Sequence, residues 1–421
     1  MKGENGKMKS DLGQTEIEAP YELPEGWKWC RLGDVADCLD GFRKPINATE
    51  RAGRTGNVPY YGATGQVGWI DDFLTNEELV LLGEDGAPFL DLIKEKAYLI
   101  SGKAWVNNHA HILRSKYGEI GNRYLLNYLN IFNYSGYVNG TTRLKLTQGE
   151  MLKIPFPLPP TLAEQQRIVN CIESMFAKLD EAKEKAQNVV DGFETRKAAI
   201  LHKAFTGELT AKWRKENGVS DDLWVEKTIG ECGSVYGGGT PSTSHKDYWE
   251  NGNILWITSK DMKNDIIEDS EMHVNMKGIE NSSAKFIEKP ALLFVMRSGI
   301  LRRTFPICMV KKEFTVNQDL KALVPYGFVL LEYLFYVCKS NEREILNTCM
   351  KNGTTVESIN AKALFDFVIF VPTLPEQQEI VRILDIIIEK ENKAKQAAEA
   401  VLEQIDLLKK SILARAFRGE L

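Results

Sequence analysis

The last fifty residues of this chain repeat a segment that lies 212 positions earlier. Residues 160–209 (PTLAEQQRIVNCIESMFAKLDEAKEKAQNVVDGFETRKAAILHKAFTGEL) align without a gap to residues 372–421 (PTLPEQQEIVRILDIIIEKENKAKQAAEAVLEQIDLLKKSILARAFRGEL), and 21 of the 50 positions are identical. Self-similarity at a fixed long offset is the signature of a repeated structural unit. The chain is therefore predicted to consist of two copies of one unit.

The duplication extends upstream, but it weakens there. The tetrapeptide NGTT at 139–142 returns at 352–355, whereas VPYYGATGQVGWI at 58–70 and ILWITSKDM at 254–262 share little. Each copy is thus predicted to have a divergent globular part followed by a similar helical part.

Both helical parts carry apolar residues at alternating steps of four and three, the pattern of a coiled coil. Each seam has one charged interruption, Arg196 in the first copy and Glu391 in the second. Two similar heptad helices in one chain most simply pair with each other. Because the globular part between them must bring the chain back, an antiparallel pair is favoured, with one globular part at each end of a rod. Packing in a bundle, or against another protein, stays open. The seams are Ile168, Ile172, Met175, Leu179, Ala182, Ala186, Val189, Phe193, Arg196, Ile200 and Ile380, Leu384, Ile387, Glu391, Ala394, Ala398, Val401, Ile405, Leu408, Ile412.

Start and stop signals flank both helices at matching positions. A threonine precedes a glutamate by three residues at the start, which is a capping box. A glycine follows the last periodic residue, where it can end a helix. These residues are Thr161, Glu164 and Gly207 in the first copy and Thr373, Glu376 and Gly419 in the second.

The other segments are predicted to be compact α+β domains with a twisted sheet. Strand-like runs at 78–82, 97–100 and 254–258 accompany helical signals at 121–132 and 329–337. The expected fold class is α+β, with two mixed α/β domains separated by two long helices that form an antiparallel coiled coil. We expect a flexible tail at 1–20, a first domain at 21–158, a central helical region at 159–215, a second domain at 216–371 and a C-terminal helical region at 372–421.

Composition narrows the function classes. No run of about 18 apolar residues occurs, so a membrane span is not expected, and the polar N-terminus lacks a secretory signal.

The seven cysteines are odd in number and contain no CxxC pair, which disfavours a zinc site or a disulfide framework and fits a reducing cytoplasm. Lys+Arg 53 against Asp+Glu 58 gives a net charge of −5. Nucleic-acid binding would therefore need local basic patches or a basic partner.

Catalytic signatures are missing from the sequence. It holds no P-loop and no Ser nucleophile elbow, and none of the Asn/Asp-Pro-Pro-aromatic tetrapeptides that amino-methyltransferases use. His109 and His111 alternate in a strand-like run, but without a third ligand nearby a structural or DNA-facing role is favoured over a metal site. Gly237–Gly239 is favoured as a turn over a phosphate cradle. The chain is predicted to be non-catalytic by itself, with an unrecognised active site as an alternative.

The layout resembles the DNA-specificity subunit of Type I restriction–modification enzymes over nearly the whole chain. The resemblance rests on the duplication and on repeated phrases, of which PxPPxxEQQRIV before a long helix is the most specific. The phrases are LPEGWKWCRLGDV at 23–35, PLPPTLAEQQRIV at 157–169, VPTLPEQQEIV at 371–381, AFTGEL at 204–209 and AFRGEL at 416–421.

The resemblance implies two target-recognition domains, 21–158 and 216–371, each reading one half of a bipartite sequence in double-stranded DNA. It implies that the helices space these domains and dock two adenine-N6 methyltransferase subunits, which two motor-nuclease restriction subunits can join. S-adenosylmethionine, ATP and Mg would belong to those partners, with no cofactor in this chain, no membrane and a cytoplasmic location.

Loops with basic residues beside Gly, Asn, Thr or aromatic residues can reach phosphates and base edges, although such clusters are often solvated faces. Tyr60 and Tyr61 alternate, so at most one should face DNA. The DNA-binding candidates are Arg43, Lys44, Tyr60, Tyr61, Gln66, Lys103, Asn107, His109, Thr141, Thr142 and Arg143 in the first domain and Lys260, Lys263, Arg297, Arg302, Arg303, Asn317, Thr354 and Thr355 in the second. The partner-docking candidates are Gln165, Gln166, Gln377 and Gln378, which could instead cap the helix starts.

Two other readings stay open at this point. A coiled-coil adaptor without DNA specificity would explain the heptads, but not two divergent domains in register with the repeat. The chain could also serve a related fused or two-subunit methyltransferase system.

Overall fold

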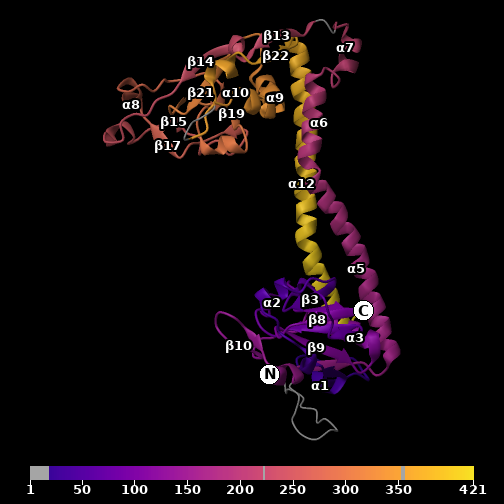
Figure 1. Ribbon diagram of the computed structural model, residues 1–421. Helices are drawn as coiled ribbons and strands as arrows, with labels where there is room; N and C mark the ends of the chain where they lie inside the picture. Colours follow the sequence, from indigo (N-terminus) through magenta and orange to yellow (C-terminus); the bar gives the residue numbers. More distant parts are fainter. Residues whose placement is uncertain (1–18, 221–222, 352–355) are drawn as a thin grey trace, which may run out of the picture. The chain divides into compact units, whose positions relative to one another are not determined.

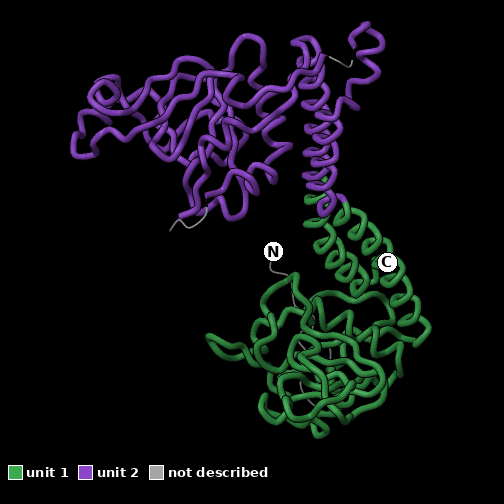
Figure 2. The backbone as a smooth tube through the Cα atoms, turned by 45° about the horizontal axis from the view of Figure 1, so that its top comes forward, with its two compact units in different colours: residues 1–188, 397–421 green, residues 189–396 purple. Residues whose placement is uncertain are grey.

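The computed structural model describes residues 19–220, 223–351 and 356–421, so the predicted tail lies outside the described residues except for Ala19 and Pro20. The chain forms two compact units (Figure 2). Unit 1 comprises residues 1–188 and 397–421, and unit 2 comprises residues 189–396. Each unit therefore combines one globular domain with part of both repeated helices.

Unit 1 contains short helices, many strands and one long helix (Figure 1). The helices are α1 (Leu32–Val35), η1 (Asp40–Phe42), α2 (Ala48–Ala52), α3 (Gly118–Leu129), α4 (Gln148–Leu152) and α5 (Leu162–Asp191), whose last residues belong to unit 2. The strands are β1 (Lys28–Arg31), β2 (Ala36–Cys38), β3 (Val58–Gly62), β4 (Gly65–Ile70), β5 (Thr75–Asn76), β6 (Leu79–Gly83), β7 (Ala97–Ile100), β8 (Lys103–Val106), β9 (Ala110–Ser115), β10 (Val138–Asn139), β11 (Lys145–Leu146) and β12 (Pro155–Leu158).

Two four-stranded sheets form the body of unit 1, in the orders β2-β9-β6-β7 and β4-β3-β8-β5. Successive side chains of a strand point to opposite faces. Leu79 and Leu81 of β6 accordingly join one apolar cluster with Ile112, while Val80 and Leu82 join another that includes α3. Strand β6 is buried on both faces, which explains its unbroken apolar sequence.

Unit 2 has the same kinds of elements. Its helices are α6 (Phe193–Phe205), α7 (Ala211–Asn217), η3 (Ile229–Cys232), η4 (Lys246–Tyr248), α8 (Met276–Glu280), η5 (Gly299–Arg302), α9 (Leu331–Ser340), α10 (Glu342–Cys349), α11 (Ala361–Phe365) and α12 (Leu374–Phe417), whose C-terminal part belongs to unit 1. Its strands are β13 (Val225–Thr228), β14 (Gly233–Gly237), β15 (Ile254–Ile257), β16 (Ile266–Ile267), β17 (Met272–Val274), β18 (Ala291–Val295), β19 (Ile307–Val310), β20 (Phe314–Val316), β21 (Leu320–Pro325) and β22 (Val368–Val371).

The divergent parts of the sequence share one sheet topology. The order β14-β21-β18-β19 in unit 2 repeats β2-β9-β6-β7 in unit 1, and the parallel pair β15–β20 repeats β3–β8. Residues 101–110 and 311–320 even have the same sequence of buried and exposed positions. The predicted α+β class and the twofold repeat are confirmed, and the repeat extends through the domains.

The two repeated helices differ at one position. The second copy is a single helix, α12, whereas the first is interrupted at Gly192 between α5 and α6. Gln404 occupies the equivalent place in α12, and glycine is a poorer helix former than glutamine by up to about 1 kcal/mol. The prediction of one continuous helix per copy is wrong for the first copy.

Helix segments pair antiparallel within each unit. In unit 1, Lys183 pairs with Asp406 at 3.3 Å and Asp180 pairs with Lys409 at 2.5 Å. Residue numbers thus decrease along α5 as they increase along α12, which is the mark of an antiparallel pair. In unit 2, the two charged interruptions of the seams meet, with Arg196 Nε 2.7 Å from Glu391 Oε2. The antiparallel pairing of the helices is confirmed.

The predicted stop signals are confirmed and the start signals only in part. Gly207 and Gly419 have φ values of +80° and +70°, which favour glycine. Thr161 Oγ1 accepts a bond from the Glu164 amide at 3.2 Å, but the Glu164 carboxylate binds Arg167 instead of completing a capping box.

The second capping box does not form because Glu376 is fully buried. Its Oε1 accepts hydrogen bonds from Thr210 Oγ1 and Arg214 Nη1, both at 2.7 Å. Arg214 also donates to the Gly207 carbonyl at 2.9 Å. This lock ties the end of the first repeated segment to the start of the second inside unit 2.

The AFxGEL motif anchors each helix end in a domain core. Phe417 is fully buried in unit 1, with ring centroids 4.9 Å from Tyr124 and 5.2 Å from Tyr128. Phe205 takes the same role in unit 2, 5.5 Å from Tyr333. Within the described residues, no helix is long and apolar enough to cross a bilayer.

Replacing Arg214 with Met should lower the free energy of unfolding by about 3–5 kcal/mol, because it leaves the buried Glu376 carboxylate without its charged partner. Urea denaturation followed by circular dichroism measures the loss. The control Arg382→Met removes an exposed pair with Glu379 and should change the midpoint little. Equal effects of the two variants would contradict the buried lock.

Reversing one charge in the seam with Arg196→Glu should destabilise unit 2 by about 0.5–1 kcal/mol, since it places two carboxylates side by side. The double variant Arg196→Glu/Glu391→Arg should recover most of the loss. A double-mutant cycle from thermal unfolding checks the pair, and purely additive effects would mean that the two side chains do not interact.

Candidate nucleic-acid interface

Corresponding loops meet at one sheet end in both domains and are held there by main-chain hydrogen bonds. In unit 1 the Glu84 amide donates to the His109 carbonyl at 2.8 Å and the Leu146 amide to the Glu84 carbonyl at 2.7 Å. In unit 2 Met296 donates to Asp319 and Ile359 to Met296, both at 2.8 Å. We call these sites the first rim (residues 84–86, 107–111 and 143–146) and the second rim (296–298, 317–321 and 356–359).

Asn107 and Asn317 occupy equivalent turns of the two rims. Both are buried, and their Oδ1 atoms accept hydrogen bonds from the amides of His109 and Asp319, at 2.8 and 3.1 Å. An asparagine that bonds its own backbone two residues on stabilises a tight turn. The structure therefore assigns these two predicted DNA contacts a shaping role in the loops.

Charged side chains of the first rim and of η1 form an ion cluster. Arg43 contacts both Asp40, at 3.1 Å, and Glu84, while Lys145 lies 3.0 Å from Glu84. Burial alone would raise the pKa of Glu84, but hydrogen bonds from Arg43 and Lys145 outweigh it and hold that pKa below its usual value. Arg43 is thus fixed in place by carboxylates on two elements.

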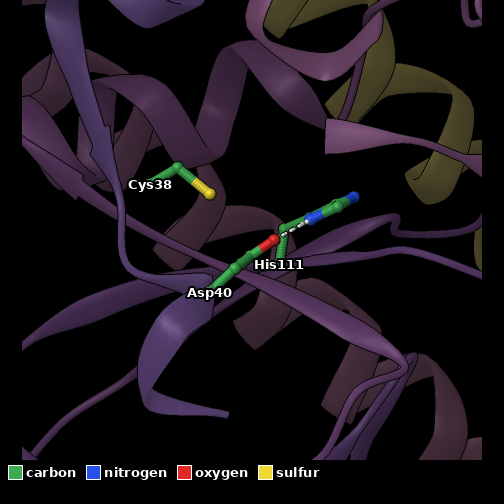
Figure 3. Close-up of side chains that lie close together, drawn as sticks. All are labelled: Cys38, Asp40 and His111. Carbon is green, nitrogen blue, oxygen red and sulfur yellow. Dashed lines mark hydrogen bonds and ion pairs between the residues drawn. The ribbon is translucent and has the colours of Figure 1, made fainter. Parts of the chain in front are cut away.

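His111 is the buried centre of this cluster. Its Nδ1 lies 2.6 Å from Asp40 Oδ2 and its Nε2 lies 2.9 Å from the Leu146 carbonyl. Both ring nitrogens therefore lie within hydrogen-bond distance of an oxygen, one on a side chain and one on the main chain. Figure 3 shows the Asp40 carboxylate directed at the ring. Burial would raise the pKa of Asp40, but the bond from His111 prevails and lowers it.

Cys38, Asp40 and His111 form the one group of three potential metal ligands within the described residues, with ligand atoms within 4.8 Å of one another. Burial raises the pKa of the Cys38 thiol to about 11, so its thiolate is scarce at neutral pH. Asp40 is already bonded to His111 and Arg43. The donor set therefore fits a closed hydrogen-bonded cluster better than a metal centre.

Asp85 organises the exposed edge of the first rim. Its Oδ1 lies 2.6 Å from His109 Nδ1 and 2.8 Å from Arg143 Nη2. The sequence candidates Arg43, His109 and Arg143 thus converge on one surface. Each of these three side chains is engaged by a carboxylate from a neighbouring segment.

The second rim carries different side chains on the same backbone. Arg297 occupies the position that Asp85 has in the first rim. Asp85 forms an isolated β-bridge to Lys145, and Arg297 forms the equivalent bridge to Ser358. Arg297 is exposed and has no ion pair with any described residue. It lines an open depression of about 590 Å³, whose polar lining includes Arg297, Gln318, Asp319, Lys321, Lys351 and Ser358.

Most other candidates of the first domain lie on or near the sheet of β3, β4 and β8, whereas Thr141 and Thr142 lie in the loop between β10 and β11. Tyr60 is 1% exposed and its hydroxyl contacts the backbone of Ile46, so it is a core residue. Tyr61 is half-buried beside Tyr98. Exposed candidates are Lys44, Gln66, Lys103, Thr141 and Thr142.

The second-domain candidates are spread more widely. Lys260 and Lys263 are exposed after β15, and Arg302 pairs with Glu357. Arg303 is exposed at the end of η5. Thr354 and Thr355 lie outside the described residues.

The four glutamines proposed for docking divide into two pairs. Gln165 and Gln377 are 2% and 0% exposed, and Gln377 donates to the carbonyls of Phe328 and Pro372. Burial makes these two residues structural, which corrects the prediction for them. Gln166 and Gln378 are at least partly exposed.

Several residues of the rims, the ion cluster and the depression are not among the DNA-binding candidates predicted from the sequence: Asp40, Glu84, Asp85, His111, Lys145, Gln318, Lys321 and Lys351. A signal was present, since VNNHAH at 106–111 and VNQDLK at 316–321 share their first two residues. Aligning the copies at these dipeptides would have placed Asp319 and Lys321 opposite His109 and His111.

Replacing Asp40 with Asn should cost about 1.5–3 kcal/mol at pH 7, since it removes a charged partner of His111. Asp40 has a pKa below its ordinary value of 3.8 in the folded state, so its contribution is present at neutral pH and lost as pH falls through the lowered pKa. The variant should therefore show a flatter decline in stability between about pH 5 and pH 3. Thermal unfolding across this range measures it.

Asp37→Asn provides the matched control for this titration, because Asp37 is an exposed carboxylate of the adjacent β2. It should reproduce the wild-type curve. Parallel curves for the wild type and the Asp40 variant would show that Asp40 does not govern the acid response.

Comparison with known proteins gives matches to both halves of the chain. The family described as Type I restriction modification DNA specificity domain matches residues 24–190 and 221–404. The specificity subunit of the Type I restriction enzyme EcoR124I/EcoR124II from Escherichia coli is 36% identical over 244 residues, which cover 55% of each chain. The chain thus spans about half the length of this curated relative.

Two solved structures share the fold. The HsdS subunit from Thermoanaerobacter tengcongensis superimposes with a TM-score of 0.61 at 19% identity, covering 96% of this chain and 100% of that one. A chain from a type I R-M system, solved for its complex assembly and conformational transition, gives a TM-score of 0.66 at 18% identity with the same coverage. Because the family match spans most of both halves, the protein belongs to the Type I restriction–modification DNA-specificity family.

Proposed function

We propose that this chain is the DNA-specificity subunit of a Type I restriction–modification complex, in which each domain reads one half of a bipartite sequence in double-stranded DNA. The observation that carries the proposal is the pair of rims. One backbone framework occurs twice within the family-matched segments, and it presents different charged side chains each time. A repeated scaffold with variable side chains suits the reading of two different half-sites.

The rims offer the groups that base readout requires. Arginine forms paired hydrogen bonds with guanine in the major groove, and a carboxylate accepts from the amino group of cytosine. The second rim contains both groups in Arg297 and Asp319, and the first contains Arg143 and Asp85. With a net charge of −5, the chain would discriminate between sequences while basic partners supply most of the phosphate contacts.

The proposed partners are two adenine-N6 methyltransferase subunits, which two restriction subunits can join. S-adenosylmethionine, ATP and Mg would then be bound by those subunits in the cytoplasm, and this chain would have no reaction of its own. Near the starts of α5 and α12, Gln166 is partly exposed and Gln378 is exposed, which makes them the retained docking candidates. An adaptor without DNA specificity would not need the duplicated rims, and nothing in the family match supports it.

Single-molecule sequencing of methylated DNA tests the proposal. In cells that make this chain with its neighbouring methyltransferase, N6-methyladenine should appear at one bipartite motif and should vanish when only this chain is deleted. Returning the gene on a plasmid should restore the motif. Methylation that is absent or unchanged in all three strains would show that the chain does not select the target.

A further inference from the structure

We propose that Arg297 is a specificity-determining residue of the second domain and selects a G·C base pair in its half-site. The inference rests on the proposed function and deepens it, because it names the base pair that one rim reads. It follows from the position of Arg297, the groups beside it and the contrast with the first rim.

The backbone around Arg297 is fixed on both sides. The Met296 amide donates to the Asp319 carbonyl at 2.8 Å, and the Ser298 amide donates to the Glu357 carbonyl at 3.1 Å. Strand β18, which leads into this turn, is wholly buried. A side chain based on such a rigid turn loses little freedom when it binds, which favours specific recognition.

The guanidinium of Arg297 is available for a ligand. No described residue pairs with it, and it faces an open depression together with Lys321 and Lys351, which also have no ion pair in the described part of the chain. By contrast, the cations of the first rim are held by Asp40, Glu84 and Asp85. The second rim therefore presents unneutralised donors.

The neighbouring polar groups match a G·C pair. Guanine offers two acceptors, O6 and N7, to the paired donors of an arginine, and its partner cytosine offers an amino group. Gln318 Oε1 accepts a hydrogen bond from Thr240 Oγ1 at 2.6 Å, which holds this side chain in place and leaves its amide NH₂ donors without a bond to another described residue. Asp319 in the same lining supplies the acceptor that the cytosine amino group needs.

The first rim supports this assignment through its opposite chemistry at the same position. Asp85 occupies the place of Arg297, with an equivalent bridge and the same flanking main-chain bonds. The backbone is retained while the side chain changes from an acceptor to a donor. A position that only shaped the loop would not need its charge reversed between the two copies.

The test uses the full chain with its methyltransferase on a plasmid library that carries randomised half-sites, with N6-methyladenine read by single-molecule sequencing. The wild type should require G·C at a position that Arg297→Gln relaxes by about tenfold or more. All positions of the other half-site should keep their preference. Arg297→Lys, which keeps the charge but loses the planar fork, should relax the same position.

The matched control is Arg343, an exposed arginine of α10 away from the rim. Arg343→Gln and Arg343→Lys should leave the motif unchanged. A motif of undiminished stringency in both Arg297 variants overturns this inference alone. If thermal melting shows that Arg297→Gln is unfolded, Arg297→Lys decides the matter. A wild-type chain that directs no bipartite methylation overturns the proposed function and this inference together.

Discussion

Aromatic burial at the helix ends is the contact on which the architecture depends. Phe417 enters the core of a domain built from the other end of the chain, and Phe205 packs half-buried beside Tyr333 against the core of unit 2. Burying a phenylalanine side chain stabilises by roughly 1.5–3 kcal/mol. At the opposite helix ends, Ile168 and Ile172 of α5 and Ile380 and Leu384 of α12 also lie in the domain cores. Unit 1 is therefore completed by residues 397–421, whereas unit 2 is one continuous stretch, residues 189–396.

In both rims the main chain fixes the shape of the loops, and the side chains determine which groups the loops present. Amide-to-carbonyl bonds fix the loops, and the two buried asparagines shape the same turn in each. The side chains that project from the loops then differ freely. In the first rim they neutralise one another around His111, while in the second Arg297 stands open. The same fold can thus present two chemistries.

The sequence allowed the repeat, the helix pair and the class of the domains to be predicted, because heptads and turn signals are local patterns. It did not reveal the break at Gly192, where one weak helix former interrupts an otherwise matching segment. It also included Tyr60, Gln165 and Gln377 among the contact candidates, and all three are buried. Burial depends on long-range packing, so polar or aromatic identity alone could not distinguish these core residues from contact residues. The ion cluster escaped notice because Asp40, Glu84 and His111 are far apart in sequence.

The main-chain origin of the rim bonds has a consequence for evolution. A substitution at Asp85 or Arg297 leaves the main-chain bonds of the loops in place, but at Asp85 it also removes the side-chain bonds to His109 and Arg143. At Arg297, selection can therefore explore new side chains at little cost in stability. Changes at Asn107 or Asn317 would instead disturb the turn itself. Mutational tolerance is therefore concentrated at positions that face outward from the rims. Under the proposed function, new target preferences would arise there by single substitutions.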